Sequence, residues 1–169
     1  MAIQNITTSL LPPSGFKFVL LRAPHLNFTV QQVSIPGITA EPPQVQTPFA
    51  AIHLAGARIQ YNPLSLTFKV TENFENYFEI LNWMKALGPD KEFGQHRELS
   101  AKGRSWDGLQ SDLDLTILSS SMNPAVNFKF IDAMPISLSD LMFDTTLSDV
   151  DYITSTVEFT YLRYDHTII

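Results

Sequence analysis

The chain has 169 residues, a formal net charge of −6 and no cysteine. This length allows a hydrophobic core without staples, and the lack of thiols excludes disulfides, cysteine-ligated zinc and a cysteine nucleophile. The acidic balance argues against general binding to nucleic-acid phosphates, but it is compatible with a surface along which nucleic acid passes. Neither a signal peptide nor an apolar run near the ~20 residues of a membrane span is evident. We therefore expect one soluble intracellular domain over residues 1–169.

The beginning of the chain predicts an arm followed by two strands. Residues 1–15 are rich in Thr, Ser and Pro and are expected to form an N-terminal arm. Alternating apolar residues predict strands over residues 16–22 and 27–35, with Phe28 directed inward. The apolar parity changes near residues 31–32, which predicts a β-bulge there.

Residues 38–56 combine three prolines with several apolar side chains. The prolines keep this segment out of a central strand, whereas Phe49, Ile52 and Leu54 make it too apolar for an idle linker. We interpret it as an extended arm that packs on a partner. A loop folded onto its own domain is the alternative.

The middle of the chain predicts a strand pair and a helix. Residues 58–61 and 64–70 are expected to pair with each other. Thr71 or Asn73 is expected to cap the helix that follows, and Gly88 is expected to end it. The apolar stripe that should pack across a sheet consists of Phe74, Tyr77, Phe78, Leu81, Met84 and Leu87.

The second half of the chain predicts further strands after a long polar loop. Residues 89–110 are polar, and loops of this length are usually functional or ordered only on binding. Strands are predicted at 111–119, 125–133 and 151–164, and partial burial between them at Leu138, Leu141 and Phe143. Strands without an alternating helix rhythm indicate a mainly β fold. We expect an antiparallel β-sandwich or barrel with one α-helix.

Residue types with catalytic potential do not form a recognisable site. Asp112 and Asp114 share one strand face and could act as acid and base or hold a cation, but their place opposite the inward leucines favours a solvated face. The serine in residues 103–108 misses the nucleophile-elbow pattern by one position. The histidines lack metal-ligand spacing: His25, His53, His96 and His166. We therefore predict no enzyme activity and no cofactor.

The order of several short motifs resembles a known family. These motifs are Phe16-Lys17-Phe18-Val19-Leu20, Ser34-Ile35-Pro36-Gly37, Leu64-Ser65-Leu66-Thr67-Phe68, Asn76-Tyr77, Trp83, Ser148-Asp149-Val150-Asp151-Tyr152 and Phe159-Thr160-Tyr161. From Phe16 onward the chain resembles the tail tube superfamily of contractile-tailed bacteriophages. It is also similar to the tail-completion and sheath-stabilising proteins of such phages.

The resemblance implies a structural virion protein of the phage tail, assembled in the host cytoplasm. Its subunits would close into a homo-hexameric ring around a lumen for DNA, and ring closure would pair the open strand edges. Stacked copies, other tail proteins and the tail sheath would be its partners. Candidate contact residues are Phe49, Ile52, Leu54, Arg97 and Arg104. Candidate acidic residues of the lumen are Asp112, Asp114, Asp132, Asp151 and Glu158.

Other functions stay open at the level of the sequence. Residues 38–56 and 89–110 fit a terminal ring that meets a different protein as well as a repeating tube ring. A tube subunit of a bacterial injection or secretion machine has the same requirements. A ligand-binding barrel would be a closed monomer without need of an arm, and an enzyme would depend on Asp112 and Asp114.

Overall fold

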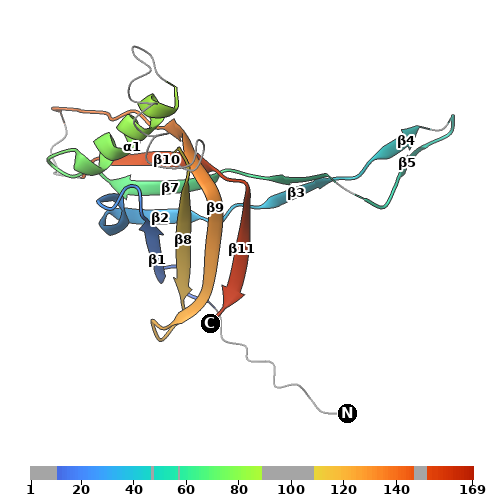
Figure 1. Cartoon of the computed structure of the whole chain (residues 1–169), viewed down its shortest axis with the longest axis horizontal. Helices are drawn as coiled ribbons and strands as arrows, with labels where there is room; N and C mark the ends of the chain where they lie inside the picture. Colours follow the sequence, from blue (N-terminus) through green and yellow to red (C-terminus); the bar gives the residue numbers. More distant parts are fainter. Residues whose placement is uncertain (1–10, 47, 57, 89–108, 147–151) are drawn as a thin grey trace.

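The computed structural model describes residues 11–46, 48–56, 58–88, 109–146 and 152–169. Within this part of the chain the backbone is mostly antiparallel β-sheet with a single α-helix, as the sequence predicts (Figure 1). No helix within it has the length and apolar character that crossing a bilayer requires.

One group of strands, called here the lower sheet from its place in Figure 1, is antiparallel throughout. Its strands in spatial order are β1 (Phe16–Leu20), β8 (Ser111–Leu118), β9 (Pro124–Leu138) and β11 (Arg163–Ile168). The predicted alternation holds in β8, where Leu113 and Leu115 are fully buried. Asp112 and Asp114 therefore lie on the opposite face of the strand.

The second group, the upper sheet, runs across the lower one (Figure 1). Its strands in spatial order are the C-terminal part of β9, β10 (Thr154–Thr160), β7 (Leu64–Lys69) and β2 (Val30–Ser34). β9 belongs to both sheets, and the register between β8 and β9 shifts between Ser111 and Leu113. Opposite this shift Asp132 adopts a φ of 56°. The resulting bulge bends β9 from one sheet into the other.

The two sheets and α1 (Glu75–Leu87) enclose one apolar core. Its side chains are Phe18, Leu20, Leu113, Leu115 and Phe130 from the lower sheet, Leu64, Leu66, Phe68, Val157 and Phe159 from the upper sheet, and Ile80 and Trp83 from α1. Full burial of one such side chain contributes about 1.5–3 kcal/mol relative to exposure. This cluster therefore holds the helix and both sheets in fixed relation.

The face that α1 buries differs from the predicted apolar stripe. The helix buries Asn76, Ile80, Trp83 and Ala86, and it leaves Phe78 49% exposed. The difference arises because Asn76 and Trp83 form hydrogen bonds that allow their polar atoms to be buried. The pattern of apolar residues in the sequence does not reveal these hydrogen bonds. The Trp83 Nε1–H donates to the carbonyl oxygen of Leu109 at 2.8 Å.

The helix ends as predicted, but its beginning does not follow the prediction. The N–H of Gly88 donates to the carbonyl oxygen of Met84. At the start, neither Thr71 nor Asn73 is the capping residue, because Phe74 occupies the N-cap position without a side-chain cap bond.

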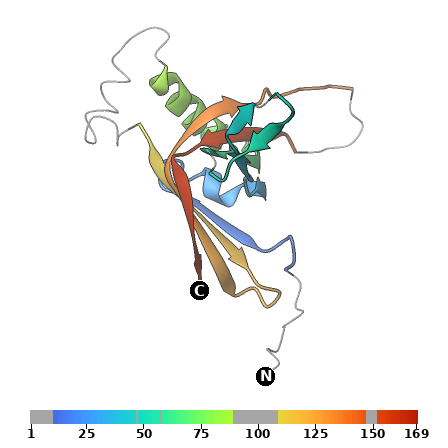
Figure 2. The same ribbon diagram turned by 90° about the vertical axis from the view of Figure 1, so that its right-hand side faces the viewer.

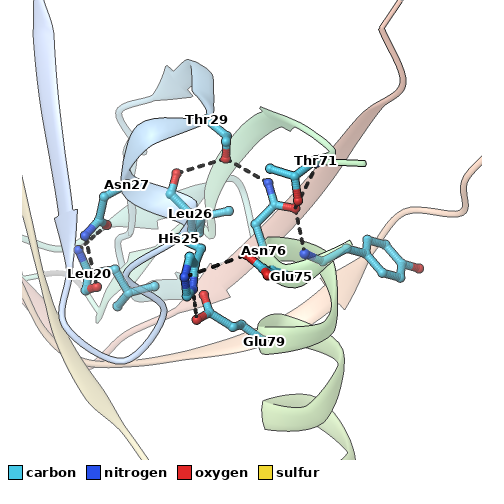
Figure 3. Close-up of polar contacts among 10 residues, drawn as sticks. Leu20, His25, Leu26, Asn27, Thr29, Thr71, Glu75, Asn76 and Glu79 are labelled. Carbon is cyan, nitrogen blue, oxygen red and sulfur yellow. Dashed lines mark hydrogen bonds and ion pairs between the residues drawn. The ribbon is translucent and has the colours of Figure 1, made fainter. Parts of the chain in front are cut away.

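Asn76 joins α1 to two other segments (Figure 3). Its Oδ1 accepts from the N–H and the hydroxyl of Thr71, both at 3.3 Å. Its Nδ2 donates to the carbonyl oxygen of Lys69 at 2.7 Å and to the hydroxyl of Thr29 at 2.9 Å. A buried amide with satisfied donors and acceptors specifies one arrangement of the elements it connects. Here it fixes the helix start against the end of β7.

The second strand begins later than predicted. Residues 26–28 form the 3₁₀ helix η1 (Leu26–Phe28), and Phe28 is 90% exposed instead of directed inward. The Asn27 side chain explains the turn, since its Oδ1 accepts from the N–H of Leu20 at 2.7 Å and its Nδ2 donates to the Leu20 carbonyl oxygen at 3.3 Å. The predicted bulge is confirmed, because the register of β2 shifts between Val30 and Gln32.

One predicted strand pairing and the predicted extent of one strand are wrong. Residues 58–61 pair with residues 38–41 and not with residues 64–70, which pair with β2 and β10 instead. The predicted strand 151–164 is two strands, since the chain leaves the upper sheet after β10 and enters the lower sheet at β11. Both errors have the same cause, because alternation shows which side chains face the core but not which strand lies alongside.

Candidate assembly surfaces

Residues 38–61 form a narrow ribbon that projects from the body (Figures 1 and 2). It consists of β3 (Ile38–Glu41) paired with β6 (Arg58–Tyr61), and of β4 (Gln44–Gln46) paired with β5 (Ala51–His53), all antiparallel. We call residues 42–56 the arm; no lysine, arginine or carboxylate occurs there. A two-stranded ribbon alone has little stability in water.

The apolar side chains of the arm face solvent. Phe49 is 99% exposed, and Ile52 and Leu54 are exposed by about half. Large exposed apolar side chains gathered on one projecting segment are typical of an interaction surface. The structure thus brings together these three predicted contact residues on a single element.

Three tyrosines fix the root of the ribbon to the body. The rings of Tyr61, Tyr161 and Tyr164 contact one another, with centroids 5.7–6.0 Å apart. The Tyr161 hydroxyl donates to the carbonyl oxygen of Asn62 at 2.8 Å. Burial, together with the neighbouring tyrosines, raises the pKa of Tyr161 to about 12, so the hydroxyl keeps its proton. The N–H of Asn62 donates to the Gly37 carbonyl oxygen on the other side of the ribbon.

The face of the upper sheet that points away from the core carries mostly small hydroxyl side chains. By strand alternation, these are Ser34, Ser65, Thr67, Ser137, Thr154, Thr156 and Thr160. The hydroxyls of Thr67 and Thr156 lie 3.1 Å apart across the β7–β10 pair. Lys69 and Glu158 are the charged residues of β7 and β10 on this face. Sequence reasoning missed this surface, although the regular Ser and Thr positions within the predicted strands were a visible signal.

Both sheets end in strands with one paired neighbour among the described residues. These are β1 and β11 in the lower sheet, and β2 and the 134–138 part of β9 in the upper sheet. Unpaired backbone N–H and C=O groups are templates for pairing with another chain. Pro135 lacks an N–H, and proline within a sheet is confined to such edges and to bulges.

Two of the predicted acidic residues lie beside Lys129 on the lower sheet, and the backbone of a third, Asp132, bonds to one of them. Asp112 Oδ2 lies 3.0 Å from Lys129 Nζ, and Asp112 Oδ1 accepts from the N–H of Asp132 at 3.4 Å. Asp114 is the cross-strand partner of Lys129. The hydrogen bond and charge of Asp112, with a smaller part from Asp114, raise the pKa of Lys129. The arrangement is an ion pair that also supports the bulge of β9.

The other predicted site residues are not brought to this cluster. Glu158 lies on the outer face of the upper sheet. Asp151, Arg97 and Arg104 lie outside the described residues, as does nearly all of the predicted polar loop 89–110.

His25 forms an exposed pair with the helix (Figure 3). Its Nδ1 lies 2.6 Å from Glu79 Oε1, and its Nε2 lies 3.8 Å from Glu75 Oε2. The hydrogen bond and charge of Glu79, followed by the charge of Glu75, raise the pKa of His25. Within the described ranges no group of three or more His, Asp or Glu side chains is arranged to hold a metal ion.

Open strand edges, a hydroxyl-covered sheet face and a projecting apolar arm define a β-subunit built for assembly. The chain matches the phage tail tube protein family over residues 7–167, and it belongs to that family. It is therefore a structural protein and not an enzyme. No curated protein sequence matches the chain.

Solved structures with a similar fold come from contractile machines. A chain of the anti-feeding prophage baseplate, determined with sixfold symmetry, has a TM-score of 0.61 at 13% identity, with 96% of this chain and 97% of that chain covered. A chain of the anti-feeding prophage tube-terminating cap has a TM-score of 0.61 at 14% identity, with 100% and 95% covered. A chain of the sheath–tube complex of an extracellular contractile injection system reaches 0.60 at 14% identity, with 96% and 95% covered.

Proposed function

We propose that this chain is a subunit of the inner tail tube of a contractile phage tail, and that its copies form a hexameric ring through which DNA passes. Membership in the phage tail tube protein family supports the tube role. The open edges of the described strands support assembly by strand pairing. The single observation that carries the proposal is the polar sheet flanked by two unpaired edges.

The ring closes through the upper sheet. β2, β7, β10 and β9 alternate in direction, so β2 and the 134–138 part of β9 run antiparallel to each other. Pairing of β2 in one copy with this part of β9 in the next therefore continues the antiparallel order around the ring. The outer face of the upper sheet then lines the lumen.

The direction of the arm supports the choice of the upper sheet. The ribbon leaves the body roughly in line with β2 and β7 (Figure 1). When these strands run along the tube, the arm extends beyond the rim of its own ring. Phe49, Ile52 and Leu54 then dock on the adjacent ring. Arg97 and Arg104 remain proposed contacts of the same assembly.

A lumen lined by hydroxyl groups suits the passage of DNA. Lys69 and Glu158 give β7 and β10 one charge of each sign on this face, so phosphates meet no cluster of cations that would hold them. Glu158 is then the described acidic candidate that faces the lumen. Asp112 and Asp114 lie on the lower sheet, away from it.

Removal of the arm tests this proposal. Replacement of residues 43–54 by a short Gly-Ser turn should leave ring closure intact and abolish stacking, because the exposed arm surface contributes nothing to the core. Negative-stain imaging and sedimentation would show single rings where the full chain forms tubes. The Met122→Asn variant is the control, since it removes an exposed apolar side chain from the β8–β9 turn. A tube from the arm-deleted chain would contradict the proposed role of the arm.

Two related roles stay open, and further observations distinguish them from a repeating phage tube ring. Full-length rings that never stack on themselves would identify a terminal ring instead of a repeating tube ring. A bacterial contractile injection system uses subunits of the same fold, and the structural similarities fit it as well. Capsid and terminase genes beside this gene would distinguish a phage tail from such a system.

A further inference from the structure

Three phenylalanines are exposed at the end of the body that lies opposite to the arm (Figure 1). β2 and β7 are antiparallel and run between the two ends, because β2 leads from η1 to the ribbon and β7 leads from the ribbon to α1. Phe28 of η1, Phe78 of α1 and Phe143, which follows β9, are 90%, 49% and 68% exposed. We call these three side chains the receiving end. Large exposed apolar side chains that gather at one place are typical of an interaction surface.

Two of the three rings share a partly buried neighbour. The ring of Phe74 lies 5.7 Å from that of Phe78 and 6.4 Å from that of Phe143. Phe74 itself is only partly exposed. The start of α1 and the segment after β9 are therefore in contact at this end, and their exposed rings belong to one surface.

Phe28 is joined to the same end through a buried polar contact (Figure 3). It precedes Thr29, whose hydroxyl accepts from Nδ2 of Asn76 at 2.9 Å. Asn76 is fully buried in the first turn of α1. The three phenylalanines thus come from segments that are fixed against one another. A surface that is formed before its partner arrives binds without the cost of ordering it.

The arm has the length and the chemistry to cover this surface in another copy. From Ile38 to Gln46 the extended chain covers about 26 Å, whereas β7 covers about 17 Å, at about 3.3 Å per residue. In stacked rings the arm therefore passes the facing rim and reaches along the body of the next copy. Because the arm carries no lysine, arginine or carboxylate, it brings no like charge to the exposed carboxylates of Glu72 and Glu75.

We propose that the receiving end of one copy docks the arm of a copy in the adjacent ring. This docking rests on the proposed stacking of rings, and it names the surface that takes the arm. The apolar side chains of the arm then cover the three phenylalanines. The contact is heterologous, because it joins opposite ends of the chain, and such a contact can repeat along an axis to give an open tube. Contact between two arms would instead stop at two rings.

Two complementary variants test the pairing of these surfaces. The donor is Phe28→Asp/Phe143→Asp, which keeps the arm and blocks the receiving end. The receiver is the arm-deleted chain, which keeps the receiving end. The donor alone should self-associate at least about tenfold more weakly than wild type, and the receiver alone should not stack. A mixture of the two should form pairs of rings that grow no further, as measured by sedimentation velocity and negative-stain imaging.

Met122→Asp is the matched control, since it places the same charge at another exposed apolar side chain. It should form tubes like the wild type. A second donor, Phe28→Ser/Phe143→Ser, removes the rings without adding charge. It should also fail to stack alone and should associate with the receiver. Association with the receiver shows that a donor is folded, because its arm acts in the complex.

Docking can be measured separately from ring closure. Each donor is labelled at an added Met122→Cys, and its sedimentation together with the receiver counts whether the particles are rings or single subunits. A wild-type chain without rings would contradict the proposed function, whereas donor–receiver association would still support the docking. Tubes from either donor alone would overturn the docking. Mixtures in which both labelled donors sediment alone would also overturn it.

Discussion

At the scale of single residues, the buried amide of Asn76 decides how α1 sits on the sheet. The Asn76→Leu variant keeps the approximate volume but leaves the Lys69 carbonyl oxygen and the Thr29 hydroxyl without this partner. We expect its free energy of unfolding to fall by about 2–4 kcal/mol, as measured by chemical denaturation. Asn82→Leu, an exposed position of the same helix, is the control and should change it by less than about 0.5 kcal/mol. Equal effects of the two variants would contradict the role given to Asn76.

Asp132 occupies the left-handed conformation that bends β9. The Asp132→Gly variant should be close to neutral, because glycine adopts this conformation without steric cost. The Asp132→Val variant should lower the free energy of unfolding by about 1–2 kcal/mol, since a β-branched residue clashes there. Thermal unfolding of the pair measures this difference. Equal stability of the two variants would show that the bend does not depend on this conformation.

The sequence predicted burial where it follows from alternation and missed it where it depends on polar contacts. Leu113 and Leu115 are buried as expected. Asn76 enters the core and Phe78 stays half exposed, because the hydrogen bonds of Asn76 turn the helix to another face.

At the scale of elements, His25 couples the turn before η1 to α1 through Glu79 and Glu75. The folded state raises the pKa of His25, so the pair stabilises the fold fully below the unfolded value of about 6.5. This contribution is lost as the pH rises through the folded pKa. The unfolding midpoint of wild type should therefore fall more between about pH 6 and about pH 8 than that of His25→Gln. Parallel pH profiles of the two proteins would contradict the coupling.

Strand existence was easier to predict than strand pairing. Periodicity located β1, β7 and β8, whose inward residues repeat every second position. It did not indicate that β6 pairs with β3, or that the chain changes sheets at Tyr161. Pairing depends on contacts between distant parts of the chain, and a local pattern carries no information on them. The tyrosine cluster at the ribbon root was missed for the same reason.

At the scale of the whole molecule, the upper sheet and the arm point to two different neighbours. In the proposed assembly the upper sheet faces the next copy in its ring, and the arm faces the adjacent ring. The central claim is ring closure through β2 and β9. The family membership and the open strand edges support it.

Cross-linking of introduced cysteines tests this claim most directly, because the natural chain has no thiol. Gln32 on β2 and Ser137 on β9 are both exposed on the outer face of the upper sheet. The account predicts that Gln32→Cys/Ser137→Cys, treated with a short bismaleimide, gives a ladder of covalent oligomers that ends at the closed hexamer. Lys17→Cys/Thr167→Cys, on the edges of the lower sheet, should remain monomeric. A monomeric first variant, or a ladder from the second, would contradict the account.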